Sequence, residues 1–205
     1  MTTAAMESPH TLAPEDQARA EFYGLLARLL RAAPDAALLQ RLAAAPDLSG
    51  HGPLATAWSR LVTASSVMDA DAAEEEYAQV FIGLGQGEVM PYASWHLTGF
   101  MMEEPLARLR EDLTAFRLVR ADGVGEPEDH IAALCEVMQL LVAGDDRAQP
   151  QSLARQHAFF RKHLRPWYAA FCAQLEAAPS ANYYRAVAAL LRAFLEVESQ
   201  AFDMD

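Results

Sequence analysis

Residues 77–99 read YAQVFIGLGQGEVMPYASWHLTG, and the rest of the chain is organised around this stretch. It begins like the end of an apolar helix, because Tyr77, Val80 and Phe81 fall on one face at helical spacing. Three glycines then break the pattern: Gly83, Gly85 and Gly87. Large side chains follow close behind them: Met90, Tyr92, Trp95 and Phe100. Glycine permits close approach of a backbone, and aromatic rings offer large contact areas. The stretch predicts a binding crevice, although a loop folded onto the core has the same composition.

Length and composition indicate one globular domain. The 205 residues suit a single core, and the apolar fraction of 52% is typical of a soluble protein. No apolar run reaches the roughly 20 residues that a membrane span needs, so we expect no membrane insertion. Cys135 and Cys172 both fall in apolar helical patterns, as expected of buried thiols in a reducing compartment. Residues 1–13 show no secretory signal and are expected to form a disordered tail, so the cytoplasm is the predicted location.

The formal net charge of -12 restricts the class of partner. Nucleic-acid binding depends on clustered Lys and Arg, whereas this chain has no such run and a single lysine, Lys162. We therefore expect no nucleic-acid partner. An acidic surface favours basic peptides through long-range attraction, although it also serves simple solubility.

Several residues mark where helices begin. Pro14 and Pro53 are expected in first turns, because proline lacks the amide hydrogen that is unpaired there. Asp35 and Asp69 are expected as N-caps. The acidic run Glu74–Glu76 is expected to be a solvated helix face.

Helical periodicity extends along the chain, and no segment has the alternating, β-branched pattern of a strand. The sequence therefore predicts an all-α fold, a single compact bundle of about eight to ten helices over residues 14–205. The loop-forming stretch near residues 119–128 is a candidate hinge within this domain.

Residues 126–130, EPEDH, form the densest cluster of ionisable groups, at the point where a loop enters an apolar helix. Asp129 could orient the His130 ring, or either side chain could meet a ligand. A metal site is disfavoured, because no second His or Cys stands at helical ligand spacing. Catalysis is disfavoured, because the chain lacks a recognisable nucleophile motif. A helix start with acids near its positive end is the third interpretation.

Five short motifs follow one another along the chain: Tyr77-x-x-Val80-Phe81-x-Gly83-x-Gly85, Pro91-Tyr92-x-Ser94, Glu126-Pro127-x-Asp129-His130, His163-Leu164-x-Pro166-Trp167 and Tyr184-Arg185-Ala186. In order and separation they resemble the TorD/DmsD/NarJ family of redox-enzyme maturation chaperones, over most of residues 15–200. Among the branches of this family, the chain is most similar to TorD and DmsD proteins, which serve molybdenum oxidoreductases.

The resemblance implies a cytoplasmic, all-helical chaperone that is not an enzyme. Such proteins bind the twin-arginine signal peptide, and often the apoprotein body, of a molybdoenzyme of the dimethyl sulfoxide reductase type. They hold the client back from export until its molybdopterin cofactor has been inserted. The family includes monomers and domain-swapped dimers, so the resemblance leaves both states open.

The peptide-binding positions of the family carry over to six residues: Val80, Phe81, Pro91, Tyr92, Asp129 and His130. Other motif and loop residues complete the predicted site: Tyr77, Gly83, Gly85, Ser94, Trp95, Glu126 and Pro127. The chain has Leu84 where the family usually has proline, which is expected to make the glycine loop less rigid. It has Tyr92 where DmsD-like members have tryptophan, which suggests a different client.

The chemistry of a twin-arginine signal supports the same site. A basic pair joined to an apolar segment requires a hydrophobic groove with carboxylates at its edge. Four side chains can line such a groove: Phe81, Met90, Tyr92 and Trp95. Three carboxylates can meet the arginines: Glu126, Glu128 and Asp129.

Two other classes of function stay open. One is a protein that binds guanine nucleotides or the molybdopterin guanine dinucleotide cofactor and delivers it to the same client. The chain lacks a phosphate-binding P-loop, so we expect no cofactor, or at most weak binding of these two. The other is a hydrolase or metalloenzyme that uses His130 with Asp129, which the ligand spacing disfavours.

Overall fold

The computed structural model describes residues 12–83, 85–120, 123, 125–146 and 148–204. Within these ranges the chain forms ten α-helices and one π-helical turn, and no strand. The elements are α1 (Pro14–Arg31), α2 (Ala36–Ala43), α3 (Pro53–Val67), α4 (Ala70–Tyr77), η1 (Ala78–Ile82), α5 (Ala93–Thr98), α6 (Glu104–Ala115), α7 (Ile131–Ala143), α8 (Leu153–His163), α9 (Tyr168–Ala177) and α10 (Tyr183–Met204). The prediction of an all-α bundle of eight to ten helices is confirmed.

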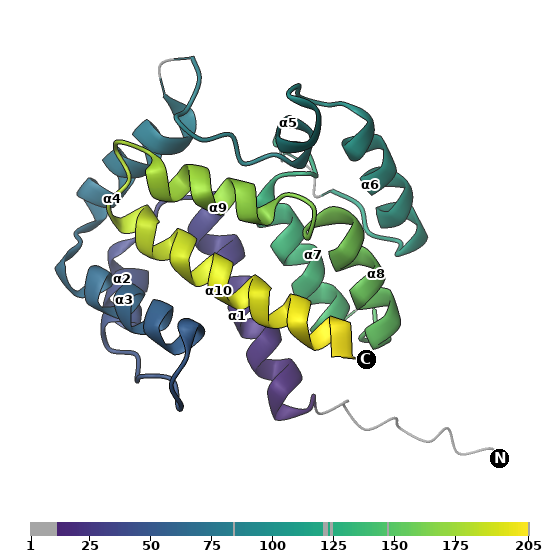
Figure 1. The fold of residues 1–205 in the computed structure, drawn as a ribbon, viewed down its shortest axis with the longest axis horizontal. Coiled ribbons are helices and arrows are strands. Elements are labelled where there is room, and N and C mark those ends of the chain that lie inside the picture. Colours follow the sequence, from purple (N-terminus) through teal and green to yellow (C-terminus); the bar gives the residue numbers. More distant parts are fainter. Residues whose placement is uncertain (1–11, 84, 121–122, 124, 147, 205) are drawn as a thin grey trace.

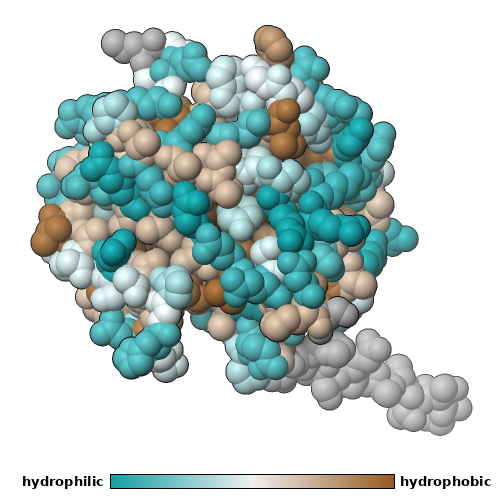
Figure 2. All heavy atoms as spheres, viewed as in Figure 1, coloured by the Kyte–Doolittle hydropathy of each residue, from teal (hydrophilic) through white to brown (hydrophobic). Residues whose placement is uncertain are grey.

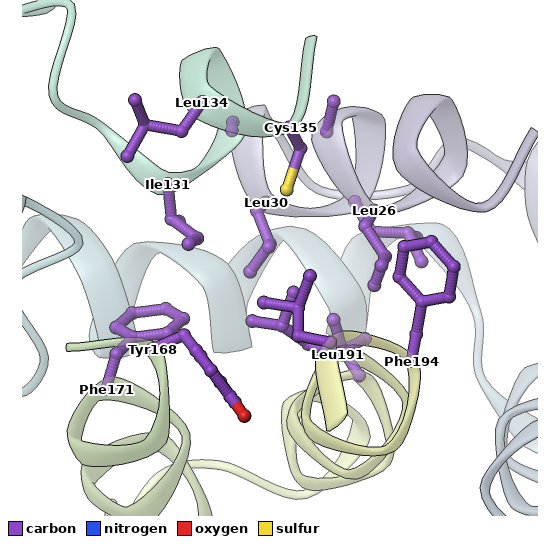
Figure 3. Packing of buried hydrophobic residues seen from close by; sticks show 14 of the residues in the cluster. Leu26, Leu30, Ile131, Leu134, Cys135, Tyr168, Phe171, Leu191 and Phe194 are labelled. Atoms are coloured by element: carbon purple, nitrogen blue, oxygen red, sulfur yellow. The ribbon is translucent and has the colours of Figure 1, made fainter. Parts of the chain in front are cut away.

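Helices α1, α7 and α10 form the centre of the bundle (Figure 1). Helix α1 packs chiefly against α7, and α10 packs against α3 and α9. Helices α2 and α3 lie at one side of the molecule, and α5, α6 and α8 lie at the other. Figure 3 shows Leu26 and Leu30 of α1 meeting Ile131 of α7 and Leu191 of α10. A continuous cluster of buried side chains thus connects helices from both halves of the sequence.

The expected helix starts are confirmed. A carboxylate oxygen of Asp35 accepts the amide hydrogen of Leu38 at 2.7 Å, and Asp69 accepts that of Ala72 at 2.9 Å. Each bond satisfies a first-turn donor that has no partner within its own helix. Two prolines stand in first turns, as predicted: Pro14 and Pro53.

The acidic run Glu74–Glu76 was expected to face solvent, and for Glu76 that expectation is wrong. Glu74 and Glu75 are exposed, whereas Glu76 is buried in the last turn of α4. Its carboxylate accepts three backbone amide hydrogens at the start of α10, from Asn182, Tyr183 and Tyr184, at 2.7, 3.0 and 2.8 Å. The first turn of α10 presents unpaired donors, and Glu76 satisfies them across the bundle.

Cys135 of α7 and Cys172 of α9 are buried free thiols, as predicted. Burial raises the pKa of both, so neither is a ready thiolate at neutral pH. Most of the predicted tail, residues 1–11, lies outside the described residues, as do 121, 122 and 124 of the candidate hinge. The tail and the hinge therefore stay predictions.

Candidate functional site

The two stretches singled out in the sequence lie side by side. Tyr92 and His130 form an isolated antiparallel bridge. The amide of Ala93 donates to the carbonyl of Asp129 at 3.0 Å, and the amide of Ile131 donates to the carbonyl of Pro91 at 2.8 Å. These backbone bonds fix the register between the start of α5 and the start of α7. The structure thus brings together the second and third motifs of the sequence.

Asp129 is directed toward α5. One of its carboxylate oxygens, Oδ2, accepts the amide hydrogen of Ser94 at 2.8 Å and its hydroxyl hydrogen at 2.6 Å. The same hydroxyl oxygen of Ser94 accepts the amide hydrogen of Met102 at 3.2 Å. Asp129 and Ser94 therefore hold together the start of α5 and the connection from α5 to α6. The carboxylate partners Ser94, so it does not serve to orient the His130 ring.

His130 caps α7. Its Nδ1 accepts the amide hydrogen of Ala132 at 3.0 Å, which requires an unprotonated nitrogen at that position. Burial, together with the smaller effect of the nearby positive charge of Arg31, lowers the pKa of His130 to about 4. The edge of one ring faces the plane of the other between His130 and Tyr92, with centroids 5.2 Å apart. The imidazole is consequently a neutral structural group at physiological pH.

Tyr92 connects this helix start to Glu126. Its hydroxyl donates a hydrogen bond to the Glu126 carboxylate, and Glu126 is exposed. Burial, followed by the hydrogen bond and negative charge of Glu126, raises the pKa of Tyr92. The phenol therefore stays protonated and keeps its hydrogen bond throughout the physiological pH range.

Tyr77 and Phe81 pack on the start of α10 and on α1. The Phe81 ring stands edge-on to Tyr184 at 5.1 Å, and the Tyr77 and Phe81 rings lie 5.0 Å apart. The Tyr77 hydroxyl donates to the carbonyl of Arg31 at 2.7 Å. Val80 is fully buried, and its carbonyl accepts the amide hydrogen of Val89. These side chains of the first motif thus anchor the start of the glycine loop to α1 and to the start of α10.

The glycine loop requires glycine at two of its positions. Gly83 has a φ of +59°, and a Cβ there would lie 2.0 Å from the carbonyl oxygen of Gln86. A Cβ at Gly87 would lie 2.5 Å from the backbone of Phe81. Gly85 also has a positive φ, of +96°, but a Cβ there would meet nothing within 4 Å. Leu84 lies outside the described residues, so its predicted effect on the loop stays a prediction.

The far end of the loop is attached to the connection between α9 and α10. The carboxylate of Glu88 accepts the amide hydrogen of Ser180 at 3.1 Å and its hydroxyl hydrogen at 2.6 Å. Glu76 binds the first residues of α10 just beyond this point. The segment from Glu76 to Glu88 is thus fastened at both ends to one connection, although sequence reasoning singled out neither acid for this role.

A hollow of about 370 Å³ borders the EPEDH segment. Apolar side chains of α6, α7 and the connection between them line most of it: Leu113, Leu118, Val119, Pro127, Val137 and Leu140. Charged residues stand around it: Arg31, Arg120, Glu126, Glu128 and Glu136. Val119 is 90% exposed, so a partner that approaches from solvent can make an apolar contact with it.

Most charges around this hollow are already paired. Arg31 binds Glu136 at 2.5 Å, and Arg110 binds Glu128 at 2.8 Å. Glu126 has only the neutral Tyr92 hydroxyl as a side-chain partner among the described residues. Among the carboxylates that border the hollow, Glu126 is therefore best placed to bind a basic group.

The structure separates the predicted residues into two groups. Only Glu126 and Pro127 border the hollow. Of the other members, most are buried, as Pro91 and Ser94 are, or half-buried, as Trp95 is, and Gly85 is exposed. The four large residues predicted to line a groove, Phe81, Met90, Tyr92 and Trp95, do not line this hollow, which is bordered by side chains of α6 and α7 that no motif contained. Their role in peptide binding stays a prediction.

The described residues hold no group of three or more His, Cys, Asp and Glu that could bind a metal ion. The Ser94 hydroxyl partners Asp129 and not an imidazole, so this pair is not the nucleophile and base of a hydrolase. The same part of the chain contains no helix with both the length and the apolar character of a membrane span.

Comparison with known proteins agrees with the motifs. The family model described as nitrate reductase delta subunit matches residues 50–173. Proteins named chaperone protein TorD are similar in sequence: one from Vibrio atlanticus is 25% identical over 132 residues, which cover 61% of each chain. Another from Actinobacillus pleuropneumoniae is 32% identical over 124 residues and 59% of each chain. A third from Shewanella loihica is 27% identical over 211 residues, covering 92% of this chain and 94% of the relative.

The fold has a solved counterpart. A crystal structure assigned as a redox enzyme maturation protein from Archaeoglobus fulgidus superimposes with a TM-score of 0.57. It covers 94% of this chain and 99% of the other, with 17% sequence identity. At that identity the match supports the architecture alone.

Proposed function

Since this chain belongs to the nitrate reductase delta subunit family, which includes the TorD and NarJ proteins, we propose that it is a maturation chaperone and not an enzyme. Its proposed client is the apoprotein of a molybdenum oxidoreductase of the dimethyl sulfoxide reductase type. It binds the twin-arginine signal peptide of that client in the cytoplasm and holds the apoprotein until the molybdopterin cofactor has been inserted. It carries no resident cofactor in this role.

One observation carries the proposal beyond family membership: Glu126 stands at the rim of an apolar hollow, beside the exposed Val119. A twin-arginine signal has a basic pair next to an apolar segment. A guanidinium of the pair would form a charge-assisted hydrogen bond with Glu126, and apolar side chains would enter the hollow. The Tyr92 hydroxyl already holds this carboxylate in place, which lowers the entropy cost of binding.

The test is isothermal titration of the full chain with a synthetic twin-arginine signal peptide and with the same peptide carrying Lys-Lys. Glu126→Gln removes the charge at the rim and keeps the size of the side chain. Glu111→Gln, an exposed acid of α6, makes the same change of net charge outside the hollow. We expect the arginine peptide to bind about tenfold more weakly to Glu126→Gln, the cost of one lost hydrogen bond to a charged group.

Equal affinity of the two glutamine variants would show that Glu126 is not a contact. Failure of the wild-type chain to distinguish the arginine from the lysine peptide would contradict recognition of the signal. Asp129→Ala and His130→Ala are poor substitutes for Glu126→Gln, because they remove structural bonds to Ser94 and Ala132.

A further inference from the structure

A second hollow, of about 690 Å³, lies where α6 and α7 end and α8 begins. Its lining includes residues from these helices and from the connection after α6: Phe116, Arg117, Leu140 and Arg155. None of them belongs to the five motifs of the sequence. Because two arginines border it, we call it the arginine hollow.

Neither arginine of this hollow has an acidic partner. The ion pairs formed among the described residues include neither Arg117 nor Arg155. Asp145 also lines the hollow, and its carboxylate accepts the amide hydrogen of Ala148 at 2.7 Å. The described lining residues therefore carry two positive charges and one negative charge, in a chain whose acidic residues outnumber its basic ones by 28 to 16.

The guanidinium of Arg155 is held in place by neutral groups. Its central carbon lies 4.5 Å from the centroid of the Phe116 ring, and its Nη1 donates to the side-chain oxygen of Gln151 at 2.5 Å. The residue stands in the first turn of α8, which contains no acid, and a cation is unfavourable at this positive end of a helix. An anion bound to Arg155 would remove that repulsion and would meet a side chain that is already ordered.

Arg117 occupies a position that glycine usually fills. The amide of Leu118 donates to the carbonyl of Leu113 at 2.9 Å, and the amide of Arg117 donates to the carbonyl of Thr114 at 3.0 Å. These two bonds form a Schellman motif at the end of α6, and they give Arg117 a φ of +59°. Glycine adopts this conformation without strain, whereas a residue with a Cβ does not. The side chain of Arg117 is therefore not required by the turn.

The arginine hollow adjoins the hollow beside Glu126. Three apolar residues line both: Leu118, Val119 and Leu140. A polypeptide that crosses this apolar strip would pass from a hollow bordered by Glu126 to one bordered by two arginines. Figure 2 shows strongly hydrophobic side chains scattered among hydrophilic ones on the face that it draws. An apolar strip that joins two hollows of different charge is thus a more specific feature than exposed hydrophobic side chains alone.

We propose that the arginine hollow binds an acidic residue of the client, in the same polypeptide segment whose basic group binds Glu126. The carboxylate accepts hydrogen bonds from the guanidiniums of Arg117 and Arg155, and an apolar neighbour of the acidic residue covers Leu118 and Leu140. Guanidinium suits this partner because its planar N–H donors match the two oxygens of a carboxylate. The proposal rests on the chaperone function and adds to it the chemistry of a second client contact.

The arginine hollow can be tested without a client. The dipeptide N-acetyl-leucyl-aspartyl amide is titrated into the ¹⁵N-labelled full chain, and the amide resonance of Leu118 is followed by NMR. We expect a saturable shift with this dipeptide and none with its asparagine counterpart, which has the same shape and no charge. Absence of a saturable shift with the aspartyl dipeptide would overturn the proposal.

Three variants test the charges. Arg155→Gln should weaken the aspartyl dipeptide at least about tenfold, whereas Arg41→Gln, which changes an exposed arginine of α2, should bind it as the wild type does. Asp145→Asn should tighten binding, because it removes a negative charge from the lining and keeps an oxygen for the amide of Ala148. Equal affinity of the two glutamine variants would contradict a contact with Arg155.

Arg117→Gly separates binding from structure. Glycine suits the turn at the end of α6, so the urea midpoint of this variant should be no lower than that of the wild type. Its affinity for the aspartyl dipeptide should nevertheless fall about tenfold. Unchanged affinity in this variant would show that the side chain of Arg117 is not a contact.

The link between the two hollows is tested with longer peptides. Twin-arginine signal peptides are prepared in pairs that carry aspartate or asparagine at successive positions after the apolar segment. At one or more positions the aspartate peptide should bind about tenfold more tightly than its partner, and Arg155→Gln should remove the difference. Equal affinities within every pair would refute a single segment that occupies both hollows.

The two proposals fail in different ways. If Glu126→Gln weakens the twin-arginine peptide but the aspartyl dipeptide gives no saturable shift, this inference is wrong and the chaperone function stands. An aspartate-specific shift in a chain that binds no twin-arginine peptide would support the arginine hollow and refute the proposed client. Inorganic phosphate that shifts the Leu118 resonance at lower concentration than the dipeptide would refute an acidic peptide as the occupant.

Discussion

Replacing Glu76 by alanine should destabilise the whole bundle, although the residue belongs to an acidic run that looks solvent-facing in the sequence. Its buried carboxylate accepts three amide hydrogens from the first residues of α10, which itself lies at the centre of the fold. A hydrogen bond to a charged group contributes roughly 1.5–3 kcal/mol, and water that enters the space left by the side chain would recover part of it. We therefore expect Glu76→Ala to lower the free energy of unfolding by about 3–5 kcal/mol.

Urea denaturation followed by circular dichroism measures this change directly. For a chain of this size, 1 kcal/mol corresponds to a shift of roughly 2–4 °C, so the melting temperature should fall by about 10 °C. Glu74→Ala is the matched control, because Glu74 precedes Glu76 by one helical half-turn and is exposed. Its substitution should change the free energy of unfolding by no more than about 0.5 kcal/mol.

Equal stability of the two alanine variants would refute the reasoning, because it would mean that the start of α10 does not depend on Glu76. Glu76→Gln refines the test, since it keeps one acceptor oxygen and loses the charge. The free energy of unfolding of Glu76→Gln should lie between those of the wild type and Glu76→Ala. A glutamine variant as stable as the wild type would show that the acceptor matters and the charge does not.

Two further predictions concern the site. Because the pKa of folded His130 is about 4 and that of an unfolded histidine is about 6.5, the unfolded chain binds the proton first as pH falls. Stability should therefore decline between pH 6.5 and pH 4, by up to about 3 kcal/mol, and denaturation of His130→Asn, which keeps a capping acceptor, should lack this component. Gly83→Ala should disrupt the loop and increase its cleavage by protease, because its Cβ would clash with the carbonyl oxygen of Gln86. Gly85→Ala meets no clash and should cost only the strain of its positive φ, about 1–2 kcal/mol. Equal cleavage of the two variants would contradict the clash at Gly83.

The features predictable from sequence are those whose physical cause is local. Asp35 and Asp69 were identifiable as caps because the amide that each binds lies three residues away. The helix starts at Pro14 and Pro53 follow from proline chemistry alone. In these cases no knowledge of the tertiary arrangement is needed.

The features that could not be predicted depend on distant partners. Glu76 meets α10 across more than 100 residues of sequence, and its exposed neighbours have the same side chain. The hollow beside Glu126 owes its lining to α6 and the outer face of α7, where apolar spacing indicates only that a helix packs against something. Tyr184 was recognised as part of a motif, but its contact with Phe81 becomes evident only from the fold.

The direction of the Asp129 side chain distinguishes this residue from Glu126 within the EPEDH segment. The bridge between Tyr92 and His130 fixes the register of this segment, so Glu126 borders the hollow while the Asp129 carboxylate is directed toward Ser94 at the start of α5. The residues of one short motif therefore occupy different places: Glu126 borders a surface hollow, and Asp129 holds the start of α5. Because Asp129 holds Ser94, and His130 caps α7, a substitution at either position changes the structure, and a loss of binding in such a variant would not identify a contact. The contribution of this segment to binding is therefore tested best at Glu126, which is exposed and whose described side-chain partner is the neutral Tyr92 hydroxyl.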